Sequence, residues 1–255
     1  MKTIRHLVLF LVTNLGVQGQ TDALFSDVNK AQKLRLKHTF SEQRDSVFSS
    51  FDTAINALLS SSEVCRELPD STNHYFLVNK LKDISPKAKH ISIGQKLAYA
   101  FMNNIVITSS GQIKIYSWDD LGGGSYHSYT NYLQYTDDKG NCITNPIDTK
   151  EEDPEVGYYD IVQIDNYYLA FGYGTYGGGK QHFLIKILKY QNNAIIELNQ
   201  LEIGSNRSQN IDLKYNSEDS TISYKAYKFE SDVGFYSKDY ETVNLKFENG
   251  KLLKI

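Results

Sequence analysis

One stretch of the chain occurs twice. Gly111–Tyr135 (GQIKIYSWDDLGGGSYHSYTNYLQY) matches Asn166–Tyr190 (NYYLAFGYGTYGGGKQHFLIKILKY), which begins 55 residues downstream and needs no gap. In this register the triplet Gly122–Gly124 falls on Gly177–Gly179. Apolar residues alternate with other residues around each triplet, which is the pattern of half-buried strands on either side of a turn. The repetition predicts one hairpin module that is used twice.

Further strand patterns surround the two copies. Asn192 and Asn193 predict a turn after the second copy. Beyond Asn210 the pattern Ile211, Leu213 and Tyr215 alternates, and Asn249–Gly250 is a strong hairpin signal. Four short strands in about 50 residues is typical of repeated β units. We therefore expect a mainly β fold with an N-terminal helix. Its β part is an antiparallel meander of two to three repeated four-stranded units, and partial-propeller, sandwich and barrel-like arrangements are all open.

The aromatic content agrees with a β fold. The chain has 19 Tyr and 12 Phe among 255 residues, and 40% of its residues are hydrophobic. Aromatic side chains favour strands with one buried face. A chain of this length and hydrophobic content can bury a substantial core.

The N-terminus has the pattern of a secretory signal. Lys2 and Arg5 precede the apolar run Leu7–Val17, and small or polar residues follow. We expect residues 1–19 to be a signal peptide that is cleaved after Gly19, and the mature protein to be exported to the periplasm, the cell surface or the medium. No later stretch approaches the roughly 18 apolar residues of a membrane helix, so no transmembrane segment is expected in the mature chain.

A helix is predicted between the signal and the β region. Thr39 and Glu42 have the spacing of a capping box, and apolar residues from Val47 to Leu59 recur at intervals of three and four. We expect a helix over about 40–60 that covers one edge or face of the β core. The expected organisation is a helical segment over 20–88 and a repeated β domain over 89–255.

The charge pattern argues against several partners and cofactors. A net charge of −3, with 27 basic and 30 acidic residues, gives no basic field for nucleic acid. A phosphate-binding glycine loop leads into a helix, whereas strand patterns follow both glycine triplets. His127 and His182 lack neighbours at metal-ligand spacing. We predict no cofactor, no metal and no nucleic acid, and the oligomeric state is unknown.

The chain has two cysteines, Cys65 and Cys142. In an exported protein they can form a disulfide that ties the N-terminal segment to the β region. The alternative is two separate thiols.

Candidate ligand-binding residues lie around the glycine triplets. Trp118 precedes the first triplet, and the 55-residue register places it on Tyr173. Tyr126 and Tyr176 lie beside the same turns. Aromatic rings next to mobile loops are typical of a platform for a glycan or a peptide. The alternative is that these rings are core residues at strand ends.

Acidic and imidazole groups at the same loops allow a catalytic alternative. Asp119, His127 and His182 are the residue types used for acid–base hydrolysis. His127 falls on His182 in the repeat register, which favours a repeated structural position for the two histidines. No G-x-S-x-G motif is present, and no catalytic serine set is predicted.

Two segments of the sequence resemble those of a loose group of uncharacterised exported proteins of Gram-negative bacteria. They are I-K-I-Y-S-W-D-D-L-G-G-G and Y-Y-L-A-F-G-Y-G-T-Y-G-G-G. The resemblance covers roughly residues 91–255 and implies export and a β-rich fold. Our leading hypothesis is an exported, non-enzymatic binding protein that uses the Gly/Tyr-rich loops for a glycan, a peptide or an envelope protein. The alternatives are a cell-wall or polysaccharide hydrolase and a structural scaffold of an envelope complex.

Overall fold

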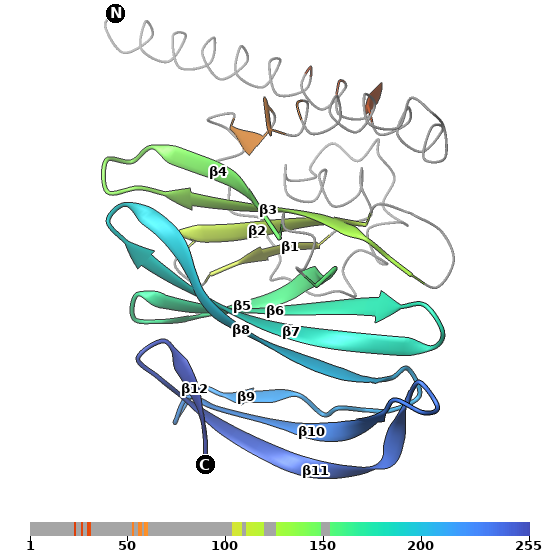
Figure 1. Ribbon diagram of the computed structural model, residues 1–255. Coiled ribbons are helices and arrows are strands. Elements are labelled where there is room, and N and C mark those ends of the chain that lie inside the picture. Colours follow the sequence, from red (N-terminus) through yellow and green to blue (C-terminus); the bar gives the residue numbers. More distant parts are fainter. Residues whose placement is uncertain are drawn as a thin grey trace, which may run out of the picture.

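The chain forms three four-stranded antiparallel sheets (Figure 1). The computed structural model describes residues 104–108, 111–119, 126–148 and 154–255, with positions 23, 27, 30, 31, 53, 56, 57, 59 and 60. The strands are β1 (Asn104–Ile107), β2 (Ile113–Asp119), β3 (Tyr129–Thr136), β4 (Cys142–Ile147), β5 (Gly157–Ile164), β6 (Tyr167–Tyr176), β7 (Lys180–Gln191), β8 (Ala194–Asn206), β9 (Lys214–Asn216), β10 (Thr221–Glu230), β11 (Phe235–Glu248) and β12 (Lys251–Lys254).

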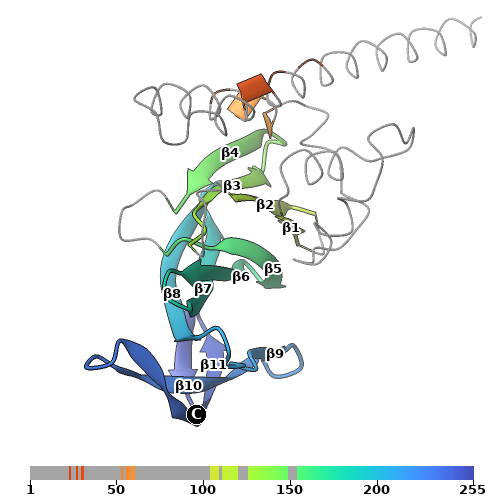
Figure 2. The ribbon, with the colours of Figure 1, turned by 90° about the vertical axis from the view of Figure 1, so that its right-hand side faces the viewer.

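Each sheet is a meander of strands that follow one another along the chain. We call β1–β4 the N-terminal sheet, β5–β8 the central sheet and β9–β12 the C-terminal sheet. Two views show the sheets stacked as three layers (Figures 1 and 2). The expected antiparallel β fold is confirmed, and the described strands do not close into a ring or barrel.

Two cores separate the three layers. The first lies between the N-terminal and central sheets and includes Ile113, Leu133, Ala170 and Leu184. The second lies between the central and C-terminal sheets. The residues of its buried cluster are Leu169, Phe171, Ile185, Ile187, Ile222, Val243, Leu245 and Phe247. The central sheet therefore contributes to a core with each of its faces.

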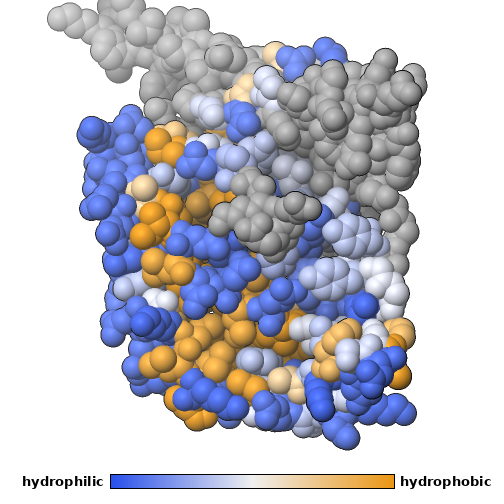
Figure 3. Space-filling model, in the orientation of Figure 1, coloured by the Kyte–Doolittle hydropathy of each residue, from blue (hydrophilic) through white to orange (hydrophobic). Residues whose placement is uncertain are grey.

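This position explains the composition of the central strands. A strand that is buried on both faces has a continuous apolar run, because both sets of alternating side chains lie in a core. In β7, Leu184, Ile185, Ile187 and Leu188 are all at most 2% exposed. Figure 3 shows apolar residues reaching the surface on the left of this face, over the central and C-terminal layers.

The two outer faces of the stack differ. In the C-terminal sheet, Ser223 pairs with Asn244 and Lys225 with Thr242 on the face that points away from the central sheet. This outer face is polar. In the N-terminal sheet the outward residues Tyr116, Tyr132 and Gln134 are at most 3% exposed. Gln134 donates a hydrogen bond to the carbonyl oxygen of Leu59 at 2.6 Å, so the N-terminal segment contacts this outer face.

Turn chemistry predicted the hairpins correctly. Asn192 and Asn193 both have positive φ angles and join β7 to β8. Asn249 and Gly250 do the same between β11 and β12. Two positive φ angles define the type I′ turn, whose twist matches that of the flanking strands. The triplet Gly177–Gly179 forms the predicted turn between β6 and β7.

The 55-residue register needs a correction. The register places Ile113 on Tyr168, and both side chains lie in the core between the N-terminal and central sheets. Ile113 therefore points toward the central sheet, whereas Tyr168 points toward the N-terminal sheet. Tyr135 and its counterpart Tyr190 even touch, with ring centroids 6.3 Å apart. The register therefore aligns residues that face each other. A one-residue shift moves every side chain of a strand to the other face, so residue-by-residue equivalence of the two copies fails.

The expectations for the N-terminal region fall mostly outside the described residues. The signal peptide and the boundary near residue 88 lie there, and both stay predictions. Positions 53, 56, 57 and 59 have helical backbone, but the described residues contain no continuous helix, so the predicted 40–60 helix is not supported. Within the described part, no helix has the length and apolarity needed to cross a membrane.

Cys142 is in a disulfide. The other cysteine of the chain, Cys65, lies outside the described residues, so the Cys65–Cys142 pairing stays a prediction.

Replacing either Leu184 or Ile185 by alanine will destabilise the protein by about 2–5 kcal/mol, the range for a large aliphatic residue in a packed core. The two residues are neighbours that point to opposite faces of the central sheet, so similar losses are expected only if both faces are packed. Urea denaturation measures the change, and Thr242→Ala on the exposed outer face is the control. A loss below about 1 kcal/mol for either core variant would contradict the three-layer arrangement.

Candidate functional site

Tyrosine and glutamate side chains gather where β6 turns into β7. Tyr176 ends β6, and Glu202 lies on the neighbouring part of β8. Tyr126, from the connection between β2 and β3, lies close enough to influence the ionisation of Tyr176, as does Tyr236 of β11. We call Tyr126, Glu155, Tyr176, Glu202 and Tyr236 the tyrosine patch. The patch therefore combines residues from the N-terminal sheet (Tyr126), the central sheet (Tyr176 and Glu202) and the C-terminal sheet (Tyr236), together with Glu155 from the connection that precedes β5.

Two Tyr–Glu hydrogen bonds organise the tyrosine patch. The Tyr176 hydroxyl donates to Oε1 of Glu202 at 2.8 Å. The Tyr126 hydroxyl donates in the same way to the carboxylate of Glu155. Burial, followed by the neighbouring carboxylate, raises the pKa of both Tyr126 and Tyr176. Both hydroxyls therefore stay protonated at neutral pH and act as hydrogen-bond donors.

Glycines beside the patch make room for two rings. The His182 ring lies over Gly174, where a Cβ atom would come within 2.6 Å of its Nε2 atom. Tyr236 lies over Gly204 in the same way, and a Cβ atom there would collide with its hydroxyl. Gly174, His182 and Gly204 pair across β6, β7 and β8, so these ring positions depend on glycine in the two flanking strands.

His182 lies beneath the patch. It is 1% exposed, and its ring centroid is 4.2 Å from that of Tyr176. Burial lowers the pKa of the imidazole, against the opposing effects of the Glu202 carboxylate and the Glu155 carbonyl. A neutral, buried ring supports Tyr176 from below and does not reach a ligand in this conformation.

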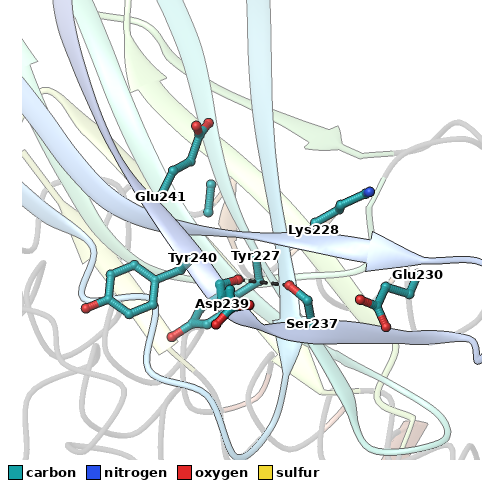
Figure 4. Close-up of a pocket in the computed structure, with 8 residues that line it drawn as sticks. Tyr227, Lys228, Glu230, Ser237, Asp239, Tyr240 and Glu241 are labelled. Carbon is teal, nitrogen blue, oxygen red and sulfur yellow. Dashed lines mark hydrogen bonds between the residues drawn. The ribbon is translucent and has the colours of Figure 1, made fainter.

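A groove of about 570 Å³ lies in the C-terminal sheet at an irregularity of β11 (Figure 4). The register between β10 and β11 shifts between Tyr227 and Phe229, and β11 has more residues than β10 in the irregular stretch. The groove is lined by Ala226, Tyr227, Lys228, Glu230, Ser237, Asp239, Tyr240 and Glu241. We call it the β11 groove. Tyr236 of the tyrosine patch directly precedes Ser237, so the patch and the groove use neighbouring residues of β11.

Aromatic and acidic groups dominate the β11 groove. Tyr240 is 53% exposed, and its ring contacts that of Tyr227 at a centroid distance of 5.6 Å. The Ser237 hydroxyl donates to the carbonyl oxygen of Asp239 at 2.8 Å, which fixes the bulge (Figure 4). The lining itself has three carboxylates and the ammonium of Lys228, while Lys225 lies over the Tyr240 ring and Lys254 Nζ lies 3.8 Å from Oε1 of Glu241. Such a lining favours ligands that donate hydrogen bonds and disfavours anions.

The predicted site residues separate into two groups. Tyr126, Tyr176 and His182 come together at the patch. Trp118 is 1% exposed and packs edge-on against Tyr132, so the structure favours the core alternative for this ring. Tyr173 packs on Phe183 on the face opposite Tyr176, because residues three apart in a strand point to opposite faces.

Asp119 and His127 are in hydrogen-bond contact, and the sequence did not predict them as a pair. Oδ2 of Asp119 lies 2.8 Å from Nδ1 of His127, and the two side chains are 18% and 39% exposed. His127 directly follows Tyr126, so the pair borders the tyrosine patch. A carboxylate on Nδ1 orients an imidazole so that Nε2 can exchange a proton.

Sequence patterns missed Glu155, Glu202, Tyr236 and the whole β11 groove. Glu155 lies in the connection between β4 and β5, and Glu202 and Tyr236 lie in ordinary strand patterns. Only the stacking of the sheets places them beside Tyr176, and no local signal marks them.

Comparisons with family models, curated proteins and solved structures return no match for this chain. Within the described ranges, no cluster of three or more His, Cys, Asp or Glu side chains has the arrangement of a metal site.

The buried His182 predicts a specific pH dependence of stability. An unfolded histidine has a pKa of about 6.5, whereas the folded ring binds a proton less readily. Below that pH the unfolded state binds more protons, so the free energy of unfolding falls on acidification. Urea denaturation at several pH values between 7.5 and 5 will show a steeper loss for the wild type than for His182→Gln. Parallel curves for the two proteins would contradict the assignment of a neutral buried imidazole.

Proposed function

We propose that the protein is an exported, non-enzymatic binding protein that holds a glycan across the tyrosine patch and the adjoining β11 groove. The observation that carries this proposal is the meeting of rings and carboxylates from all three sheets at the tyrosine patch, whose Tyr236 is next to the groove residue Ser237 on β11. Its parts come from distant places in the sequence, namely Tyr126, Tyr176, Glu202 and Tyr236 in the patch and Tyr240 in the groove.

The chemistry of these groups supports a glycan. Sugar rings present apolar C–H faces that pack on aromatic rings, and hydroxyl groups that donate to carboxylates. Tyr126 and Tyr240 are 41% and 53% exposed, and Lys225 Nζ lies 5.1 Å from the centroid of the Tyr240 ring, so a ligand would pack on the remaining exposed part of that ring. Glu202 and the groove carboxylates Glu230 and Glu241 are exposed acceptors. Because the groove is acidic, a neutral glycan is favoured over an anionic one.

We also propose that the three sheets are copies of one four-stranded unit, stacked as in an open, partial propeller. Each sheet has the same order of consecutive antiparallel strands. The turn at Asp138 contacts the turn at Asn193, and Tyr126 lies near Tyr176, so the N-terminal and central sheets have corresponding connections at corresponding ends. This arrangement places the loops of successive units on one rim, where a ligand can span them.

Alanine at both Tyr126 and Tyr240 will weaken glycan binding about 100-fold, because each exposed ring is expected to contribute about 1.4 kcal/mol. Glycans are first identified with a glycan array and insoluble polysaccharides, and affinities are then measured by calorimetry. Leu253→Ala, which removes an exposed apolar side chain elsewhere, is the control. Unchanged affinity in the double variant would exclude this surface. Capture of a stoichiometric protein or peptide instead of a glycan would support the envelope-partner alternatives.

The Asp119–His127 pair supports one second candidate, a hydrolase of cell-wall or polysaccharide material. In this role His127 acts as the acid–base group and Asp119 orients it. Purified protein that releases sugar ends from a bound glycan, with the release abolished by Asp119→Asn while binding persists, would establish this function. Binding without turnover would support the binding protein.

A further inference from the structure

A lysine is buried between the N-terminal and central sheets. Lys186 lies in the middle of β7, and its side chain is 0% exposed. Its Nζ atom lies 2.5 Å from Oδ1 of Asp148, which follows β4, and 2.9 Å from Oε2 of Glu197 on β8. The Asp148 side chain is 4% exposed, whereas that of Glu197 is 42% exposed. The glycan proposal uses none of these three residues.

Two further side chains bind the carboxylate of Asp148. Asn131 Nδ2 donates to its Oδ2 atom at 2.9 Å, and the Tyr158 hydroxyl donates to its Oδ1 atom at 3.1 Å. Asn131 and Tyr158 are themselves buried. Neutral donors on both oxygens withdraw electrons from the carboxyl carbon and stabilise negative charge that develops on the oxygens.

A bulge in β8 places Glu197 beside the lysine. The register between β7 and β8 shifts between Ile187 and Leu188, so that Glu197 pairs with Leu188 and Leu198 is the extra residue. Without the shift, Glu197 would share a face with Asn199 and Leu201 and point to the C-terminal sheet. Bulges re-aim side chains in this way near reactive sites.

We infer that Lys186 and Asp148 condense to an intramolecular isopeptide bond, with Glu197 as the proton carrier. A C=O bond is about 1.2 Å long, so the 2.5 Å contact to Oδ1 leaves Nζ at most about 3.7 Å from Cγ. Groups held at such a separation react with very high effective concentrations, of about 10⁵–10⁸ M in well-oriented cases. Burial of the pair also excludes the water that would favour hydrolysis.

The condensation balances without any other reactant. Glu197 accepts a proton from the Lys186 ammonium, and the free amine attacks Cγ of Asp148, which forms the N–C bond. Asn131 and Tyr158 hold the oxygens of the tetrahedral intermediate. One Cγ–O bond then breaks, and the oxygen leaves as water with two protons that originate from Nζ. Glu197 returns to its starting state, and no group is oxidised or reduced.

The charge states of Lys186, Asp148 and Glu197 limit the rate of the condensation. Burial alone would lower the pKa of Lys186, but the carboxylates of Asp148 and Glu197 outweigh this effect and raise it. The ion pair is therefore the resting form, and the reaction passes through its minor neutral form. We expect a single slow event after folding.

Intact-mass measurement of the purified, folded and disulfide-reduced protein will show the loss of one water molecule. Tryptic digestion will yield a branched peptide that contains both Lys186 and Asp148, because trypsin does not cleave after an acylated lysine. Lys186→Arg retains the positive charge but cannot condense, and Glu197→Gln retains the size of the side chain but cannot carry the proton. Both variants should keep their full mass.

A wild-type protein that keeps its full mass after prolonged incubation in the folded state would overturn the inference. A water loss that maps to other residues would overturn it as well. Loss of water from Glu197→Gln at the wild-type rate would remove Glu197 as the proton carrier. If Lys186→Arg does not fold, the wild-type mass and Glu197→Gln, whose changed side chain is partly exposed, still decide the question.

Discussion

The structure depends on a sheet that has no solvent-facing side. The central sheet packs against the N-terminal sheet with one face and against the C-terminal sheet with the other. The C-terminal sheet does not have this property, because its outer face is polar. Burial on both faces explains why the sequences of β6 and β7 are almost continuously apolar. It also explains why a polar residue within these strands requires partners from another layer.

Lys186 is the strongest case of that requirement. A buried ammonium without a carboxylate costs several kcal/mol, so its partners must be in place when the layers meet. Asn131, Tyr158 and Asp148 come from β3, β5 and the end of β4, while Glu197 comes from β8. The polar contacts form only when the N-terminal sheet lies in one register on the central sheet. Apolar packing alone tolerates many registers, and this network selects one.

The sequence predicted the strands and turns, because these depend on interactions between residues that are close together in the chain. Alternation and the turns at Asn192–Asn193 and Asn249–Gly250 located the strands of the β region, including those of the third sheet. The layer order and the facing of each strand were not predictable, because they depend on contacts between distant segments. The gap-free match of the two copies therefore aligned residues whose side chains point in opposite directions, which is the effect of a shift by one residue.

The predicted site was recovered only in part for the same reason. Tyr126 and Tyr176 lie near recognisable turns, whereas Glu202 and Tyr236 join them only through stacking.

The irregular positions of the strands explain where the polar chemistry occurs. A regular three-layer stack of β-sheets directs side chains either into a core or into solvent, and it offers no concave polar surface. The bulge of β11 opens the groove beside Tyr240, and the bulge of β8 turns Glu197 toward Lys186. Gly174 and Gly204 act similarly, since a missing side chain lets His182 and Tyr236 lie over the strands. Each departure from regular pairing costs some ladder or packing energy, and in this chain these departures lie beside the polar clusters to which we assign the proposed binding and condensation.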